Sequence, residues 1–159
     1  MRIVLINVPN TYELVGNDPV IIKEQQGVYP PLGILYIAAY LQRTGRYDVH
    51  VIDAQCENLT HQEVAERVKD MDPDMVGLTA MTFTLVDVKM VIQEIRKRCN
   101  PYIVIGGPHT AIYPNECFNR EGLGADFVVV GEGEITLDEM CQDIALGNVT
   151  REDSIERRT

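Results

Sequence analysis

The sequence predicts an α/β fold: a doubly wound sheet of five parallel strands with helices on both of its faces. Five short runs rich in Val and Ile alternate along the chain with segments of helical periodicity. These runs are mostly apolar on both faces, which is typical of parallel strands covered by helices on both sides. The predicted strands are Arg2–Val8, Tyr47–Ile52, Met75–Thr79, Tyr102–Ile105 and Phe127–Val130. Right-handed crossovers between them favour the strand order 2-1-3-4-5 of flavodoxin-like and Rossmann-like sheets.

Helices are predicted in the segments between the strands. The first, about Leu32 to Arg43, is apolar nearly all round and should be heavily buried. The second begins at Thr60, where Thr60-His61-Gln62-Glu63 has the pattern of a capping box. Apolar side chains at helical spacing mark the third helix, with Thr84 as its candidate cap, and the last. They are Val88, Val91, Ile92 and Ile95 in the third, and Leu137, Met140, Cys141 and Ile144 in the last. Part of Thr110–Asn119 allows a weak helix, which Pro114 disfavours.

The size and charge of the chain limit what it can be. Its 159 residues suit one domain, 1–147, followed by a polar tail or linker, 148–159. The formal net charge of −10 argues against nucleic acid and anionic membrane as partners. The longest apolar run, Leu32–Leu41, is shorter than the about 20 residues that span a bilayer. The four cysteines are far apart and form no C-x-x-C pair, and nothing suggests export, so we expect reduced thiols in a cytoplasmic protein.

Sheets of this kind bind ligands beyond the carboxyl ends of their strands. The sequence motifs that bind the commonest ligands of this fold are absent here. Asn7-Val8-Pro9-Asn10-Thr11 follows the first strand, so there is neither a G-x-G-x-x-G loop for a dinucleotide nor a Ser/Thr/Gly-rich loop for a flavin phosphate. Thr79, rather than a phosphorylatable aspartate, ends the third strand. The connection from Pro9 to Pro31 is unusually long, and its position at a strand's carboxyl end favours a functional role.

Four motifs occupy the strand ends instead. They are Tyr29-Pro30-Pro31-Leu32-Gly33 in the first loop, Gly77-Leu78-Thr79-Ala80-Met81-Thr82-Phe83-Thr84, Ile105-Gly106-Gly107-Pro108-His109-Thr110, and Val130-Gly131-Glu132-Gly133-Glu134. With these four motifs in this order, the chain resembles the cobalamin-binding domain that precedes the catalytic barrel of cobalamin-dependent radical S-adenosylmethionine enzymes. The resemblance extends from about residue 2 to residue 146. That class includes the anaerobic magnesium-protoporphyrin monomethyl ester cyclase.

The resemblance implies that cobalamin lies with its corrin over the strand ends and its nucleotide tail in a slot. The candidate cofactor-binding residues are Asn7, Pro9, Tyr29, Leu32, Asp53, Thr79, Ala80, Met81, Thr82, Gly106, Gly107, His109, Gly131, Glu132 and Gly133. No catalytic and no metal-binding residue is predicted.

Several of these residues have a second interpretation. Gly106 and Gly107 either form a slot wall without side chains or only a tight turn. The hydroxyl of Thr79 either meets the tail or reflects β-propensity. Asp53 either touches the tail or caps the next turn. Glu132 either accepts hydrogen bonds from the corrin rim or favours the following helix N-terminus.

The chain departs from other cobalamin proteins in its histidines. The methionine synthase and mutase type carries D-x-H-x-x-G in the first loop, and its histidine ligates cobalt. No histidine occurs among residues 1–49 here, so no imidazole from that motif is expected on cobalt. His109 is interpreted as a loop residue that makes one hydrogen bond rather than as a ligand.

On its own the domain is expected to bind rather than to catalyse. The resemblance implies a radical S-adenosylmethionine catalytic domain, in cis or in trans, for methyl transfer or radical cyclisation. S-adenosylmethionine and a 4Fe–4S cluster would belong to that absent domain, because this chain lacks the three closely spaced cysteines that a cluster needs. Two alternatives remain: a free-standing corrinoid carrier or sensor, and a degenerate domain that has lost the ligand.

Overall fold

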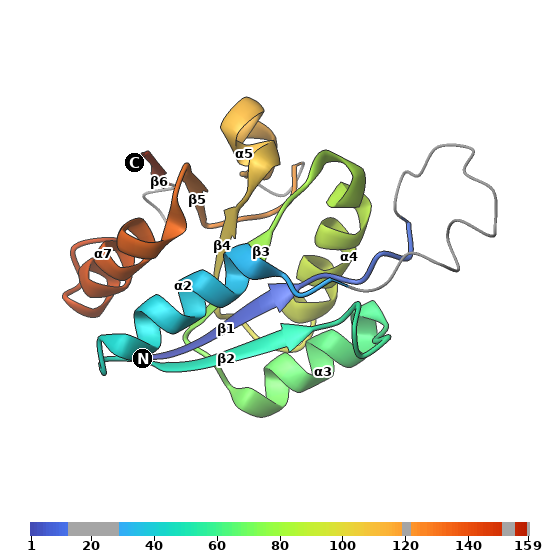
Figure 1. The fold of residues 1–159 in the computed structure, drawn as a ribbon, viewed down its shortest axis with the longest axis horizontal. Helices are drawn as coiled ribbons and strands as arrows, with labels where there is room; N and C mark the ends of the chain where they lie inside the picture. The colour runs from blue at the N-terminus through green and yellow to red at the C-terminus, as the bar shows by residue number, and fades with distance from the viewer. Residues whose placement is uncertain (13–28, 119–121, 151–154, 159) are drawn as a thin grey trace.

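All of the sheet's strands run parallel. The computed structural model describes residues 1–12, 29–118, 122–150 and 155–158 (Figure 1). The strands are β1 (Arg2–Asn7), β2 (Asp48–Asp53), β3 (Met75–Thr79), β4 (Tyr102–Gly106), β5 (Phe127–Val130) and β6 (Ile155–Arg158). Their order is β2-β1-β3-β4-β5-β6. The five predicted strands and the order 2-1-3-4-5 are confirmed.

The sixth strand was not predicted from the sequence. β6 pairs in parallel with β5, with Ile155 opposite Phe127 and Arg158 opposite Val130. From the sequence this segment is predicted to be part of a polar tail, because Ile155 is the only apolar residue in Ile-Glu-Arg-Arg. Edge strands tolerate charged residues, since backbone pairing on one side holds them in the sheet. Hydrophobic patterning therefore gave no signal for this strand.

Two helical layers cover the sheet (Figure 1). α2 (Leu32–Arg43) and α7 (Gly133–Ala145) pack on one face, over a core that includes Ile3, Met75 and Phe127. α3 (His61–Met71) and α4 (Leu85–Arg96) pack on the other, over a core that includes Val4, Val76 and Ile103. Residues of opposite parity along each strand thus enter two separate cores, as the period of a strand requires. No helix in the described part of the chain has the length and apolar character needed to cross a membrane.

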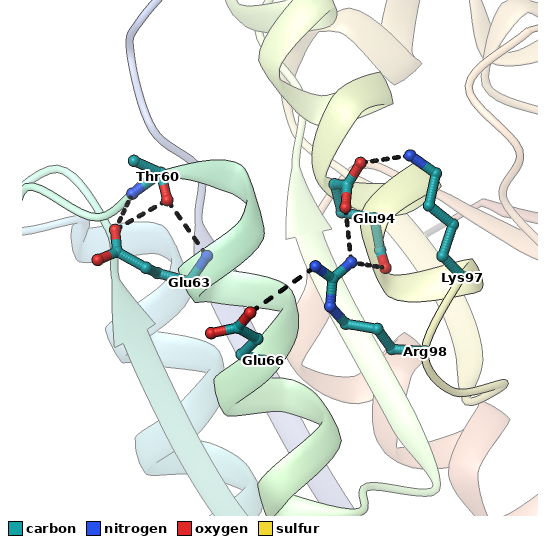
Figure 2. Close-up of polar contacts among 6 residues, drawn as sticks. All are labelled: Thr60, Glu63, Glu66, Glu94, Lys97 and Arg98. Atoms are coloured by element: carbon teal, nitrogen blue, oxygen red, sulfur yellow. Dashed lines mark hydrogen bonds and ion pairs between the residues drawn. The ribbon is translucent and has the colours of Figure 1, made fainter.

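Polar contacts lie at the start of α3 and around the end of α4, and one of them joins the two segments (Figure 2). Thr60 and Glu63 form the predicted capping box: the Glu63 backbone N–H donates to Thr60 Oγ1 over 3.2 Å, and the Thr60 N–H donates to Glu63 Oε2 over 2.8 Å. Arg98 pairs with Glu94 on α4 (2.6 Å) and with Glu66 on α3 (3.8 Å). The hydrogen bonds from Lys97 and from its neighbour Arg98 hold the pKa of Glu94 below its ordinary value.

Three local expectations need revision. The first predicted helix, α2, is not heavily buried: only Ile34, Ala38 and Leu41 are buried, and Tyr36 is 67% exposed, because one face of the helix lies on the sheet and the other faces solvent.

The other two expectations concern Pro114 and Thr84. The segment around Pro114 forms two short helices, α5 (Pro108–Ile112) and α6 (Pro114–Cys117), instead of one weak helix. Pro114 occupies the first turn of α6, where its missing N–H costs no hydrogen bond. Thr84 precedes α4 as expected, but its hydroxyl donates to the Met81 carbonyl and makes no cap bond to the helix. Residues Thr82–Thr84 form the 3₁₀ turn η1 between β3 and α4.

Candidate cofactor-binding site

A cavity of about 640 Å³ opens at the carboxyl ends of β1, β3, β4 and β5. It lies between the sheet and the N-terminal turns of α2 and α7, which contribute Leu32 to Ile34, Ile37, Gly133 and Leu137 to its lining. Its volume falls within the range of pockets that enclose small-molecule ligands. The position agrees with the general rule for ligand sites in doubly wound sheets.

The cavity exists because side chains become small along the strands on this face. β3 places Met75, Gly77 and Thr79 on the α2/α7 side in succession. On β4 the residue after Val104 on that side is Gly106, and beyond β5 Gly131 follows Val129 in the same way. The helices therefore rest on large side chains toward the amino ends of the strands. Toward the carboxyl ends the small residues leave a cavity beneath them, although the Leu5 side chain covers Gly77, where an added Cβ atom would lie 2.7 Å from Leu5 Cδ2.

The adjacent glycines Gly106 and Gly107 have different roles. A Cβ atom built on Gly106 would come no closer than 3.9 Å to its nearest neighbour, Val129, so this position borders open space. A Cβ atom on Gly107 would lie 2.6 Å from Thr79 Oγ1 and 2.9 Å from the Ala80 carbonyl oxygen, and φ there is +104°. Gly107 is thus required by the close contact of two loops. Gly106 lines the cavity, as the slot interpretation expects, and its role toward a ligand stays a prediction, whereas Gly107 has the geometry of a tight turn.

Gly133 and Gly131 shape the far wall. A Cβ atom on Gly133 would lie 2.7 Å from Ile37 Cδ1, so the absence of a side chain lets α7 approach α2. Gly131 has φ of +96°, which L side chains rarely adopt. Both residues line the cavity together with Glu132. The last loop therefore brings its backbone close to the space where a ligand would lie.

The β1–β2 side of the cavity is polar. Asn7 ends β1 and lines the cavity, and its Nδ2 donates to Asp53 Oδ1 over 2.8 Å. Asp53 Oδ1 also accepts the backbone N–H of Cys56 over 3.3 Å, and Asp53 itself does not line the cavity. Of the two predicted roles for Asp53, the structure contains the turn cap and adds an anchor for Asn7. Gln55, which the sequence analysis did not select, lines the cavity and donates from Nε2 to the Val8 carbonyl over 3.1 Å.

His109 lies behind the cavity wall. Its side chain is only 2% exposed, and Nδ1 is hydrogen-bonded to Thr82 Oγ1 over 3.1 Å. Its backbone N–H donates to the Ala80 carbonyl over 3.0 Å. Nε2 lies 3.4 Å from Glu116 Oε2, without the geometry of a hydrogen bond. Thr82, Ala80 and His109 thus join the β3 and β4 loops and do not face the cavity.

The mouth of the cavity carries exposed apolar side chains. Tyr29 and Leu32 are 79% and 63% exposed, and Met81 and Phe83 are 38% and 40% exposed. All four line the cavity. Apolar groups that remain in water around a cavity mark a site for a ligand or partner. Here they would suit a large, flat and partly apolar ligand lying over the strand ends.

The predicted residues divide into two groups. Those that line the cavity are Asn7, Tyr29, Leu32, Thr79, Met81, Gly106, Gly107, Gly131, Glu132 and Gly133. Those that do not are Pro9, Asp53, Ala80, Thr82 and His109. Pro9 lies in the sheet-proximal part of the first loop, most of which, residues 13–28, is outside the described residues.

The floor and the helix side of the cavity were not predicted from the sequence. The floor includes Leu5, Gly77, Val104 and Val129, and α2 contributes Ile34 and Ile37. These residues resemble ordinary core positions in the sequence. The parity of Gly77, Gly106 and Gly131 along their strands could have revealed them, since all three fall on one face.

Comparisons with known proteins agree with this geometry. Residues 19–140 match the family model described as the B12 binding domain. An uncharacterized methyltransferase of Pyrococcus horikoshii is 38% identical over 120 residues, which are 74% of this chain and 25% of that protein. The anaerobic magnesium-protoporphyrin IX monomethyl ester cyclase of Rubrivivax gelatinosus is 38% identical over 114 residues, 70% of this chain and 20% of the enzyme.

A solved structure has the same fold. The apo form of the cobalamin-dependent S-adenosylmethionine radical enzyme OxsB superposes with a TM-score of 0.62 at 17% identity, covering 94% of this chain and 19% of that one. The chain therefore spans about a fifth to a quarter of the length of these relatives.

Proposed function

The chain belongs to the B12 binding domain family, and from that premise we propose that it is the cofactor domain of a cobalamin-dependent radical S-adenosylmethionine enzyme. Cobalamin is the cofactor of this family, and the residues present fit it. The observation that carries the proposal is the open, glycine-floored cavity at the carboxyl edge of the sheet, within the matched segment. A side chain at Gly106 would fill the space that a narrow arm of the cofactor needs.

The residues can be given roles toward the cofactor. The cavity between the sheet and α2 would hold the nucleotide tail, with Gly106 and Thr79 in its floor. The apolar rim of Tyr29, Leu32 and Met81 would contact the corrin above the strand ends. Cobalt chemistry is supplied by the cofactor when it is bound. The chain's own residues bind and orient it and exclude water from its tail.

The lower face of cobalt would receive no imidazole from this site. All three histidines of the sequence, His50, His61 and His109, lie in the described part of the chain, and none of them lines the cavity. His61 is paired with buried Asp87, and His109 is held by Thr82. The free state of all four cysteines supports a reducing, cytoplasmic environment.

The binding step is tested with hydroxocobalamin. Purified protein is mixed with the corrinoid, passed through gel filtration and examined by its visible spectrum. We expect the corrinoid to elute with the protein at an equimolar ratio. Protein that elutes colourless would contradict the proposal and favour a degenerate domain that has lost its ligand.

The proposed link to a radical S-adenosylmethionine catalytic domain is tested by reading the gene and its neighbours. The proposal expects a segment with the cluster-binding spacing C-x-x-x-C-x-x-C, in the same reading frame or in a neighbouring one whose product co-purifies with this chain. The protein segment with this cysteine spacing would bind the 4Fe–4S cluster and S-adenosylmethionine. Cobalamin binding without any such partner would instead favour a corrinoid carrier or sensor.

A further inference from the structure

Two side-chain amides on the β1–β2 side of the cavity are fixed in one orientation. Asn7 donates from Nδ2 to the Asp53 carboxylate over 2.8 Å. Gln55 donates from Nε2 to the Val8 carbonyl oxygen over 3.1 Å. Both residues line the cavity, Asn7 from the end of β1 and Gln55 from the turn after β2. They come from neighbouring parallel strands whose ends are in register, Asn7 opposite Asp53.

The chemistry of the two partners decides which end of each amide is engaged. A carboxylate and a backbone carbonyl both accept hydrogen bonds and cannot donate them. Turning over either amide would place its oxygen against another acceptor. The NH₂ group of each amide must therefore face the protein.

The carbonyl oxygens are the ends that remain for a ligand. Within the described residues neither Asn7 Oδ1 nor Gln55 Oε1 accepts a hydrogen bond. The hydroxyl of nearby Thr84 is already engaged in both directions, since it donates to the Met81 carbonyl over 3.1 Å and accepts the Met81 N–H over 3.3 Å. This side of the cavity thus presents acceptors.

We infer that Asn7 and Gln55 form an acceptor pair that selects a corrinoid by its hydrogen-bond donors, and that it rejects corrinoids whose rim carries carboxylates. The inference rests on the proposed cobalamin-binding function. The donors are either amide N–H groups of the corrin rim or hydroxyl groups of the nucleotide arm. A carboxylate offers neither donor, and it would bring a negative charge to a protein that already carries a net −10. Asp53 acts as a positioning residue, because it orients Asn7 without lining the cavity.

The test measures dissociation constants of three probes by visible-spectrum titration. The probes are hydroxocobalamin, diaquacobinamide, which has the amide rim without the nucleotide arm, and cobyrinic acid, whose rim groups are carboxylates. We expect cobyrinic acid to bind at least about tenfold more weakly than diaquacobinamide to the unaltered protein. One lost neutral hydrogen bond corresponds to a roughly three- to tenfold weaker Kd, so Gln55→Met and Asn7→Leu should each weaken hydroxocobalamin binding by about that factor.

The chain offers a matched control for Gln55→Met. Gln42 also donates from Nε2 to the carbonyl of a strand residue, Val49, over 3.3 Å, but it does not line the cavity. Gln42→Met should therefore change the melting temperature as Gln55→Met does and leave the Kd for hydroxocobalamin unchanged. If Asn7→Leu does not fold, the Gln55 and Gln42 pair still decides the question.

The probes also identify the donor. A loss of affinity in Gln55→Met for both hydroxocobalamin and diaquacobinamide assigns the donor to the rim, and a loss for hydroxocobalamin alone assigns it to the nucleotide arm. Equal affinities of the Gln55→Met and Gln42→Met proteins, or equal binding of cobyrinic acid and diaquacobinamide, would overturn the inference while leaving the proposed function intact. An unaltered protein that binds no corrinoid would instead remove the proposed function itself.

Discussion

Adding a side chain at Gly106 should separate ligand binding from folding. The nearest neighbours of a Cβ atom at this position are 3.9 Å away, and its backbone has no positive φ. Gly within a strand is less favourable than Ala by roughly 0.5–1 kcal/mol. Gly106→Ala should therefore raise the free energy of unfolding slightly, and Gly106→Val should at least preserve it. Both added side chains would extend into the floor of the cavity.

The expected effect on binding follows from overpacking. Forcing extra methyl groups into an occupied space costs about 1–3 kcal/mol, which corresponds to a roughly 5- to 150-fold increase in Kd. Gly106→Val should thus lose most of its affinity for hydroxocobalamin, and Gly106→Ala should lose less. The affinity is measured by visible-spectrum titration and the stability by urea denaturation of the protein without ligand.

Gly107 provides the contrast for the same experiment. Gly107→Ala would place a methyl group 2.6 Å from Thr79 Oγ1 at a φ of +104°. With ψ of 179°, this backbone conformation is essentially restricted to glycine and costs another residue about 1–3 kcal/mol, so this variant should be less stable than the unaltered protein even before any ligand is added. The reasoning is refuted if Gly106→Val binds hydroxocobalamin as tightly as the unaltered protein. It is equally refuted if Gly106→Ala destabilises the protein as much as Gly107→Ala does.

Three further outcomes are expected. Gly33→Ala, on α2 with nothing within 4 Å of the added Cβ, should stabilise the ligand-free protein by up to about 1 kcal/mol in urea denaturation and weaken cobalamin binding, because Gly33 lines the cavity. With Ellman's reagent at pH 8, exposed Cys56 should react at once, whereas Cys141, whose pKa burial raises to about 12, should react only on unfolding. Thr60→Ala should lower the free energy of unfolding by about 1 kcal/mol through loss of the cap, and the loss should shrink in acid. The backbone N–H and the hydroxyl of Thr60 both donate to Glu63 Oε2 and lower the pKa of Glu63 from its ordinary 4.5. Of these two bonds the variant loses only the hydroxyl bond, which stabilises the fold above pH 4.5 and is lost as the pH falls through the lowered value.

The sequence allowed most of the fold to be predicted because the signals were strong and local. Four of the predicted strands, β1, β3, β4 and β5, are mostly buried apolar runs, and the edge strand β2 still buries Val49 and Ile52. The capping box at Thr60 formed as expected. β6 could not be predicted in this way, since its place depends on backbone pairing with β5 rather than on apolar side chains. One weak helix was predicted around Pro114 instead of two short ones, because proline is compatible both with the end of one helix and with the first turn of the next.

The candidate site was only partly predictable for a different reason. Motifs at the strand ends led to the residues of the loops, such as Thr79 and Glu132, which do line the cavity. The motif did not show that His109 turns away from it, because that depends on the hydrogen bond to Thr82 across two loops. The amide of Gln55 was missed because its role depends on Val8, which lies far from it in the sequence.

One face of the sheet mainly stabilises the fold, and the other contains the candidate binding site. On the α3/α4 side the strands stay filled up to their carboxyl ends, where Leu78, Ala80 and Val130 continue the core. On the α2/α7 side the corresponding positions, Gly77 and Gly106, carry no side chain. Removing apolar side chains from one end of a core costs stability through lost burial. The continuous core on the opposite face offsets that cost, so the sheet can keep a cavity at its carboxyl edge.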